Sequence, residues 1–283
     1  MVTTLKNDTF VPEVATMVAT ATFPNVLALG FAGSPFVRTL PATDAIGDEG
    51  DLVKFPRYDP LGEFADMTED VALVPEKLKS SLDQAVVQVG GKAVEVTDFA
   101  QLSARGDPSQ EVGRQVPVLA SRYVDTKLVD EGETTALETN VAQTITWEVF
   151  VDSIITNWGD KAMQMVGGLV VHSKVMGDLM KLPEFKRADQ LGMPGTIITG
   201  FVGALGTYPV FVSDRLTLTV GTPNTHTNLV FKRGALGLMF QRTLLVERDR
   251  DVLKKNWVIA ADVRLAVHLF FDNPLPAIRL ITQ

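Results

Sequence analysis

The stretch that decides the fold is Trp257-Val-Ile-Ala-Ala-Asp-Val-Arg-Leu-Ala-Val-His-Leu-Phe-Phe271, in which every odd-numbered residue is apolar. The even-numbered positions include Asp262, Arg264 and His268. This alternation with a period of two predicts a β-strand with one buried face. At a rise of about 3.3 Å per residue the strand would be about 50 Å long, whereas strands in globular proteins usually hold about 3–10 residues.

The clearest helical pattern covers Asp107–Glu131. Asp107 can cap the helix, and Pro108 suits its first position. Apolar residues then recur at helical spacing, namely Val112, Val116, Leu119 and Tyr123. A helix over this range would be about 34 Å long. Pro117 lies inside it, and because its ring clashes with the preceding turn, we expect a kink there.

The first 98 residues predict extended structure. Residues 1–43 are apolar but interrupted by Pro12, Pro24, Pro35 and Pro41, which indicates an arm lying on a partner, with one short helix from Pro12 to about Thr20. Residues 44–98 resemble strands. Here Ala85–Val89 and Lys92–Val96 flank Gly90-Gly91, a pattern that predicts a projecting hairpin with its turn at the glycine pair.

The rest of the chain indicates a mixture of short helices and strands. The expected elements are a helix at Thr146–Trp158 ended by Gly159, a buried strand at Leu169–Val171, a capped helix starting at Ser173 and covering Lys174–Leu182, short strands and tight turns over 196–212, and a loop over Val220–Asn228.

Composition excludes several classes of protein. The chain has 283 residues, of which 46% are hydrophobic and 21% charged, so it can bury a large core and is not disordered. No apolar run reaches the length of about 18 residues that a membrane helix needs, and the first ten residues show no secretory signal. The absence of cysteine excludes disulfides, thiol nucleophiles and cysteine-based zinc sites, and predicts a reducing compartment or indifference to redox conditions.

The charge balance points to self-association rather than nucleic-acid recognition. A formal net charge of −8 without any lysine- or arginine-rich block argues against a duplex-binding protein and is explained by solubility. The positive mean hydropathy of +0.15 indicates that other chains cover some apolar surface.

No catalytic, cofactor-binding or metal-binding residue is predicted. His172, His226 and His268 are far apart in sequence, lack zinc-site spacing and are expected to be structural. There is no nucleophile-elbow motif. Gly90-Gly91-Lys92-Ala93 fails as a phosphate loop because no Ser or Thr follows the lysine, and the glycines between Gly200 and Gly206 fail as a dinucleotide motif because a strand follows.

The clustered charges have ordinary structural explanations. Asp48, Glu49 and Asp51 lack the calcium-loop pattern, and helix-end solvation accounts for Asp130, Glu131 and Glu133. The alternating run Glu247–Asp251 suits a solvated strand-to-turn rim or an ion-pair ladder between subunits, with solvation preferred.

The order of these elements resembles that of the major capsid proteins of tailed bacteriophages, which have the Hong Kong 97-like fold. The resemblance covers nearly the whole chain and rests on the order of short phrases, with Pro117 as a departure from the family pattern. The phrases are Gly50-Asp51-Leu-Val-Lys-Phe-Pro56-Arg57, Gly91-Lys92-Ala-Val-Glu-Val-Thr97-Asp98, Asp107-Pro108, Val171-His172-Ser173, Pro209-Val210-Phe-Val-Ser213-Asp214 and Lys232-Arg233-Gly234-Ala235-Leu236.

This resemblance implies an α+β fold with an N-terminal arm at 1–43, an extended hairpin loop at 44–97, a peripheral domain at 98–139 and 225–283 that contains a spine helix at 107–131, and an α/β axial domain at 140–224. It also implies a structural protein rather than an enzyme. Copies would form pentamers and hexamers of an icosahedral shell around double-stranded DNA, without sequence-specific binding, cofactor or membrane. The implied partners are portal, scaffolding and decoration proteins, and the implied location is the virion, assembled in the host cytoplasm.

Physical reasoning supports a shell subunit. So long a strand is more typical of shell-forming subunits than of small enzymes, and segments that reach across neighbours bury apolar surface by repeated contacts. An acidic subunit would also repel packaged DNA. Two alternatives stay open. One is a host-encoded nanocompartment shell that encloses cargo enzymes. The other is an α/β enzyme, which would be a compact monomer with a radius of gyration of about 19 Å.

Overall fold

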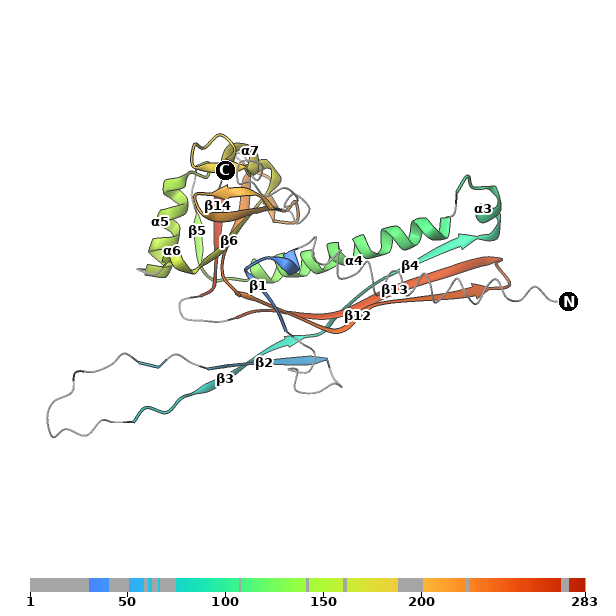
Figure 1. The fold of residues 1–283 in the computed structure, drawn as a ribbon, viewed down its shortest axis with the longest axis horizontal. Helices are drawn as coiled ribbons and strands as arrows, with labels where there is room; N and C mark the ends of the chain where they lie inside the picture. The colour runs from blue at the N-terminus through green and yellow to red at the C-terminus, as the bar shows by residue number, and fades with distance from the viewer. Residues whose placement is uncertain are drawn as a thin grey trace.

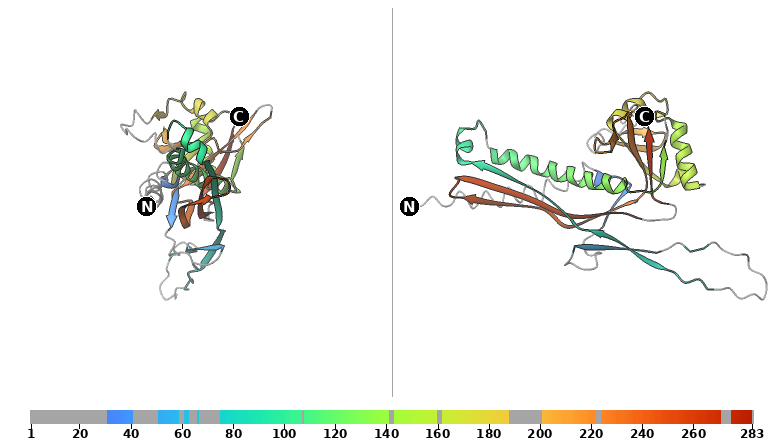
Figure 2. Two further views of the ribbon diagram at one scale, coloured as in Figure 1. Left: turned by 90° about the vertical axis from the view of Figure 1, so that its right-hand side faces the viewer. Right: turned by 180° about the vertical axis from the view of Figure 1, so that it is seen from behind.

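The chain forms a compact α/β part, a long helix lying on a long sheet, and a projecting two-stranded hairpin (Figures 1 and 2). A computed structural model describes residues 31–40, 51–58, 61–62, 66, 75–106, 108–140, 143–159, 162–187, 201–221, 224–270 and 275–282. The helix expected from Pro12 to about Thr20 lies outside these residues, as do Asp48, Glu49, the expected cap Asp107, Gly200 and Phe271. The long sheet, the helix on it and the hairpin give the molecule an elongated shape.

The long sheet has the strand order β1-β12-β13-β4. The predicted strand is confirmed as β13 (Asn256–Leu269). It pairs antiparallel with β12 (Leu236–Asp251), a strand of 16 residues of which the sequence indicated only the last few. β4 (Gln88–Thr97) pairs antiparallel with the other side of β13, and the short β1 (Val37–Leu40) runs parallel to β12.

The predicted long helix is confirmed as α4 (Pro108–Gly132), which lies along one face of this sheet (Figure 1). It continues without a break through Pro117, and the kink there stays a prediction. Buried residues one turn apart on the helix share a hydrophobic cluster with alternate residues of β13, namely Val116, Ala120, Val124 and Leu128 with Ala261, Val263 and Leu265. Each large aliphatic side chain buried in this way contributes about 1.5–3 kcal/mol. A short helix, α3 (Asp98–Ser103), precedes α4 and is capped by the Thr97 hydroxyl.

The predicted hairpin turn at Gly90-Gly91 is wrong. Both glycines lie inside β4, where Gly90 pairs with Val263 and Gly91 with Asp262. Gly90 is needed because β4 approaches α4 closely at this position. A Cβ on Gly90 would stand 2.5 Å from the ring of Tyr123 on α4. A glycine pair serves a tight turn and a crowded strand equally well, so the dipeptide alone did not distinguish them.

The hairpin that does project is formed by β2 (Leu52–Tyr58) and β3 (Ser80–Val86), paired antiparallel with Leu52 opposite Val86. At its root Val53, Phe55 and Ala85 are buried in a cluster with Met239 of β12 and Ala266 of β13. From this root the hairpin leads away from α4 (Figure 1). It is therefore anchored on one face and at one end.

The compact part is built on a second sheet of order β5-β14-β11-β6-β9-β8-β7, with β10 paired to β11. All six residues of β6 are buried, which confirms the predicted strand. The strands are β5 (Glu138–Asn140), β6 (Val166–Val171), β7 (Phe185–Arg187), β8 (Phe201–Leu205), β9 (Tyr208–Val212), β10 (Leu218–Thr219), β11 (Thr225–Lys232) and β14 (Ala277–Thr282).

The helices of this part confirm the predictions in outline. α5 (Trp147–Trp158) begins after the cap Thr146 and ends at Gly159, and the short α6 (Ala162–Met165) follows. α7 (Ser173–Leu179) starts where expected, but its cap is His172, and it ends three residues before the predicted Leu182. Local turns between Leu179 and Phe185 replace the last helical turn there.

The loop predicted over Val220–Asn228 is wrong in its second half, because β11 begins at Thr225. Asn228 is fully buried in the strand. Its Nδ2 donates to Thr282 Oγ1 at 2.9 Å, and its Oδ1 accepts from the backbone N–H of His172 at 3.3 Å. Partners on distant segments thus satisfy a residue type that normally favours loops.

Aromatic packing joins the compact part to the long sheet. Phe36 stacks on Phe231 with ring centroids 4.9 Å apart and meets Phe211 edge-on at 5.3 Å. Phe31, in the short 3-10 helix η2 (Phe31–Gly33), belongs to the same cluster. The backbone N–H of Phe31 donates to Asp125 of α4 at 2.9 Å. Burial raises the pKa of Asp125, while the bond from Phe31 and the charge of Arg215 oppose that rise.

We expect Gly167→Ala to destabilise the subunit by about 1–3 kcal/mol, because the added Cβ overpacks a strand interior. That atom would stand 2.8 Å from the backbone nitrogen of Arg233 and 2.9 Å from the carbonyl carbon of Lys232, and backbone cannot move aside. Urea unfolding of unassembled subunits measures the effect. The matched control is Gly177→Ala in α7, where nothing lies within 4 Å and helix propensity predicts a gain of up to about 1 kcal/mol. Equal unfolding midpoints for the two variants would contradict the prediction.

Candidate interaction surfaces

The histidines occupy structural positions, two of them side by side. The rings of His172 and His226, distant in sequence, have centroids 5.1 Å apart. His172 Nδ1 accepts the backbone N–H of Lys174 and so caps α7. Within the described residues no three His, Cys, Asp or Glu side chains form a group that could hold a metal ion. His268 lies apart from this pair, at the root of the hairpin, where its ring stacks on Phe55.

Two of the three acidic residues at the end of α4 also hold neighbouring segments by hydrogen bonds, in addition to the solvation expected for them. Glu131 accepts the backbone N–H of Leu269 at 3.1 Å. Glu133 accepts both the backbone N–H and the hydroxyl of Thr217, at 2.8 and 2.6 Å. Asp130 lies 3.9 Å from Lys127 and is exposed, as expected. These carboxylates therefore tie α4 to the long sheet and to the compact part.

The charged run at the end of β12 pairs within its own chain. Arg248 and Arg250 lie over the ring of Trp257, at 3.9 and 5.2 Å from its centroid. Arg250 also contacts Asp98 of α3 at 3.0 Å. The side chain of Asp251 accepts two backbone N–H groups of the following turn, 2.9 Å from Leu253 and 3.1 Å from Lys254. These contacts stabilise the far end of the long sheet.

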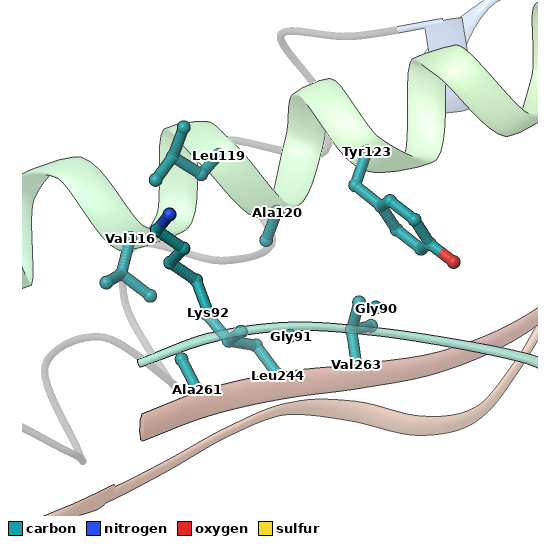
Figure 3. A pocket seen from close by; sticks show the side chains of 10 residues that line it. All are labelled: Gly90, Gly91, Lys92, Val116, Leu119, Ala120, Tyr123, Leu244, Ala261 and Val263. Carbon is teal, nitrogen blue, oxygen red and sulfur yellow. The ribbon is translucent and has the colours of Figure 1, made fainter. Parts of the chain in front are cut away.

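A pocket of about 270 Å³ lies between α4 and β4 (Figure 3). Gly90 and Gly91 form part of its floor, so the glycine pair that failed as a phosphate loop instead makes room below the helix. Lys92 is the one charged residue among the described residues of the lining. Tyr123 forms the opposite wall, and burial raises the pKa of its hydroxyl. The remaining lining residues are apolar, namely Val116, Leu119, Ala120, Leu244, Ala261 and Val263. The pocket suits an apolar side chain better than a polar ligand.

Two further surfaces expose large apolar side chains. One is the outer face of the hairpin, where Leu82 is 51% and Val86 60% exposed. The other is the far end of the long sheet, where Leu253 is 95% exposed beside Val252 and two residues of α3, Phe99 and Leu102. The alternation of residues along β3 was a sequence signal for the exposed face of the hairpin. The surface at the far end of the long sheet forms only because the fold brings α3 beside the β12–β13 turn. Contiguous exposed apolar groups mark interaction sites.

The exposed apolar side chains of the hairpin and of the far end of the long sheet are the candidate interaction surfaces among the described residues. Among the described helices none is long and apolar enough to cross a membrane.

Comparison with known proteins identifies the class. No protein-family model matches the chain. A curated protein, the major capsid protein of Staphylococcus phage phiMR11, is 25% identical over 230 residues, which is 80% of this chain and 80% of that protein. The capsid of Ralstonia phage GP4 superposes with a TM-score of 0.66 and 12% identity over 89% of this chain and 90% of that chain. A chain from Mycobacterium phage Che8 superposes with a TM-score of 0.60 and 16% identity over 93% and 91%.

The α+β fold is thus that of phage capsid proteins, and the resemblance found in the sequence is confirmed. The chain is therefore similar in sequence to a phage major capsid protein, and it has the fold of phage capsid proteins.

Protonation of His226 should make the subunit less stable in acid. Burial lowers the pKa of His226, and the nearby His172 and Lys174 lower it further, while Asp178 opposes them. The unfolded chain therefore binds a proton on this imidazole at a higher pH than the folded chain does. The stability that the neutral His226 contributes is complete above about pH 6.5, and it is lost as the pH falls through the lowered pKa of the folded state.

Urea unfolding between pH 7 and pH 5 measures this loss. We expect His226→Gln to lose less stability over that range than the wild type. Asp178→Asn removes the neighbour that raises the pKa and should lose more. Parallel curves for all three proteins would show that His226 does not contribute.

Proposed function

We propose that the chain is the major capsid protein of a tailed phage with Hong Kong 97-like organisation. Copies assemble as pentamers and hexamers into an icosahedral shell around double-stranded DNA. The observation that supports this most directly is the projecting β2–β3 hairpin, which exposes a second apolar face after its first face has been buried.

The two faces of the hairpin differ in what covers them. The root of the inner face packs on the long sheet through Val53 and Phe55. On the outer face Leu52 lies opposite Val86, and Leu82 lies four residues further out along β3, all three exposed. One buried face is enough to hold a hairpin on its body, and among the described residues nothing covers the outer apolar side chains, so they are available to another molecule.

The pocket between α4 and β4 is a receptor of matching chemistry. Its apolar lining accepts an aliphatic side chain, and Lys92 complements the acidic residues between β2 and β3, where six Asp and Glu accompany two Lys over 59–79. The hairpin leads away from α4 of its own chain, so the receptor belongs to a neighbouring copy (Figure 1). A contact between two different surfaces can repeat from copy to copy. It forms a closed ring of subunits when the rotation between neighbouring copies allows it.

We assign the segments as the resemblance implies. Residues 1–43 form the N-terminal arm and 44–97 the extended loop, with β4 as the strand through which this loop joins the long sheet. Residues 98–139 and 225–283 form the peripheral domain, with α4 as its spine. Residues 140–224 form the axial domain near the centre of each capsomer.

The proposed partners follow from this role. Portal, scaffolding and decoration proteins contact the shell, which assembles in the host cytoplasm and becomes part of the virion. The shell encloses DNA without sequence-specific binding, and a net charge of −8 keeps the genome from adhering to the wall. A strongly basic inner surface of the particle would argue against this last point.

Replacing the outer face of the hairpin should prevent closure of the shell while leaving the subunit folded. Leu82→Asp combined with Val86→Asp removes two apolar contacts of about 1.5–3 kcal/mol each. Subunit association should therefore weaken by at least about a hundredfold. Sedimentation and negative-stain microscopy of the purified protein measure particle yield. The matched control is Gln84→Asp on the same exposed face of β3, which adds a carboxylate without removing an apolar side chain and should weaken association far less.

The same particles separate the competing functions. Packaged DNA and a portal vertex are expected for a phage shell, whereas protein cargo would indicate a nanocompartment. The elongated subunit does not fit the compact monomer that an α/β enzyme would form. A wild-type chain that stays a solitary monomer at every concentration would contradict the proposed function.

A further inference from the structure

We propose that His268 is a positioning residue that couples the root of the β2–β3 hairpin to the C-terminal end of α4. The residue belongs to β13, pairs with Gly237 of β12, and points its ring into the junction of three elements. The side chain is 7% exposed, so it acts within the junction rather than at the surface.

Both strands of the hairpin meet the ring. Phe55 of β2 stacks on it with centroids 5.4 Å apart and an interplanar angle of 14°. Asp83 of β3, directly opposite Phe55 in the strand pairing, brings its Oδ2 to 3.5 Å from Nε2. Because one partner holds the ring face and the other its edge, the hairpin root cannot swing without moving the imidazole.

The helix meets the other ring nitrogen. Glu131, in the last turn of α4, places Oε1 3.7 Å from Nδ1 and accepts the backbone N–H of Leu269 with the same oxygen at 3.1 Å. Phe270 closes a further side of the ring, edge-on at 6.0 Å. The imidazole therefore has carboxylates at both nitrogens, one from the hairpin and one from the helix.

This arrangement gives the hairpin a mechanical connection to α4. Asp83 and Glu131 are 48 positions apart in sequence and approach the same buried ring from separate elements. A hairpin that packs on a neighbouring subunit would transmit its tilt through His268 to the end of α4. That use in a shell rests on the proposed function, whereas the coupling itself is a property of the single subunit.

Hydrogen–deuterium exchange of the full-length, unassembled subunit tests the coupling. We expect Asp83→Asn to accelerate exchange at the end of α4, over residues 128–132, by about threefold or more. Conversely, Glu131→Gln should accelerate exchange in β3 by a similar factor. Both cross-effects should disappear when either substitution is combined with His268→Leu, which keeps an apolar side chain but removes both ring nitrogens.

A purely structural histidine would not produce this pattern. The matched control is His226→Leu, at a buried histidine of the other sheet, which should leave both cross-effects unchanged. If His268→Leu does not fold, His268→Gln replaces it, and the two carboxylate variants are informative in the wild-type background. Cross-effects that are absent in that background, or that persist without His268, would overturn the proposal. Failure to form particles would contradict the proposed function and leave the exchange result standing.

Discussion

The packing of α4 against one face of the long sheet is the interaction on which the rest of the molecule depends. The buried stripe of the helix and the odd-numbered residues of β13 form one hydrophobic cluster, which also reaches Phe231 and Phe211 of the compact part. One helix can cover only one face of such a sheet. The hairpin root packs on residues of β12 and β13 outside this cluster. Because the helix and the strands are long and the hairpin extends from them, the subunit is elongated.

The hairpin and the compact part are attached to this centre in different ways, because the compact part shares the central hydrophobic cluster whereas the hairpin root has a small cluster of its own. The compact part is joined by stacked aromatic rings and by Glu133 bound to Thr217. The hairpin is joined by a few buried side chains and by the ring of His268. The small cluster at its root allows the hairpin to extend outward while the rest of the subunit keeps its internal packing.

Several polar residues that the sequence singled out contact neighbouring segments in the described part of the chain. The polar clusters that the sequence singled out hold described segments of the chain together, as His172 does for α7 and Glu131 for β13. The exposed apolar groups on the hairpin and at the far end of the long sheet are what remains for contact with other molecules. The alternating pattern in β3 made the exposed face of the hairpin partly predictable. The surface at the far end of the long sheet was not predictable in this way, because it brings α3 beside the β12–β13 turn, which is distant in sequence.

Elements whose signal lies within one segment were predictable from the amino-acid sequence. The periodicity of two in β13, the helical spacing in α4 and the caps of α5 each depend on residues within one segment. Tertiary structure decided which segments meet. It placed Gly90-Gly91 under Tyr123 within a strand, buried Asn228 among distant partners, and set His268 between Asp83 and Glu131. The physical reason is that propensity and periodicity act between near neighbours, whereas close approach and burial depend on residues far apart in the chain.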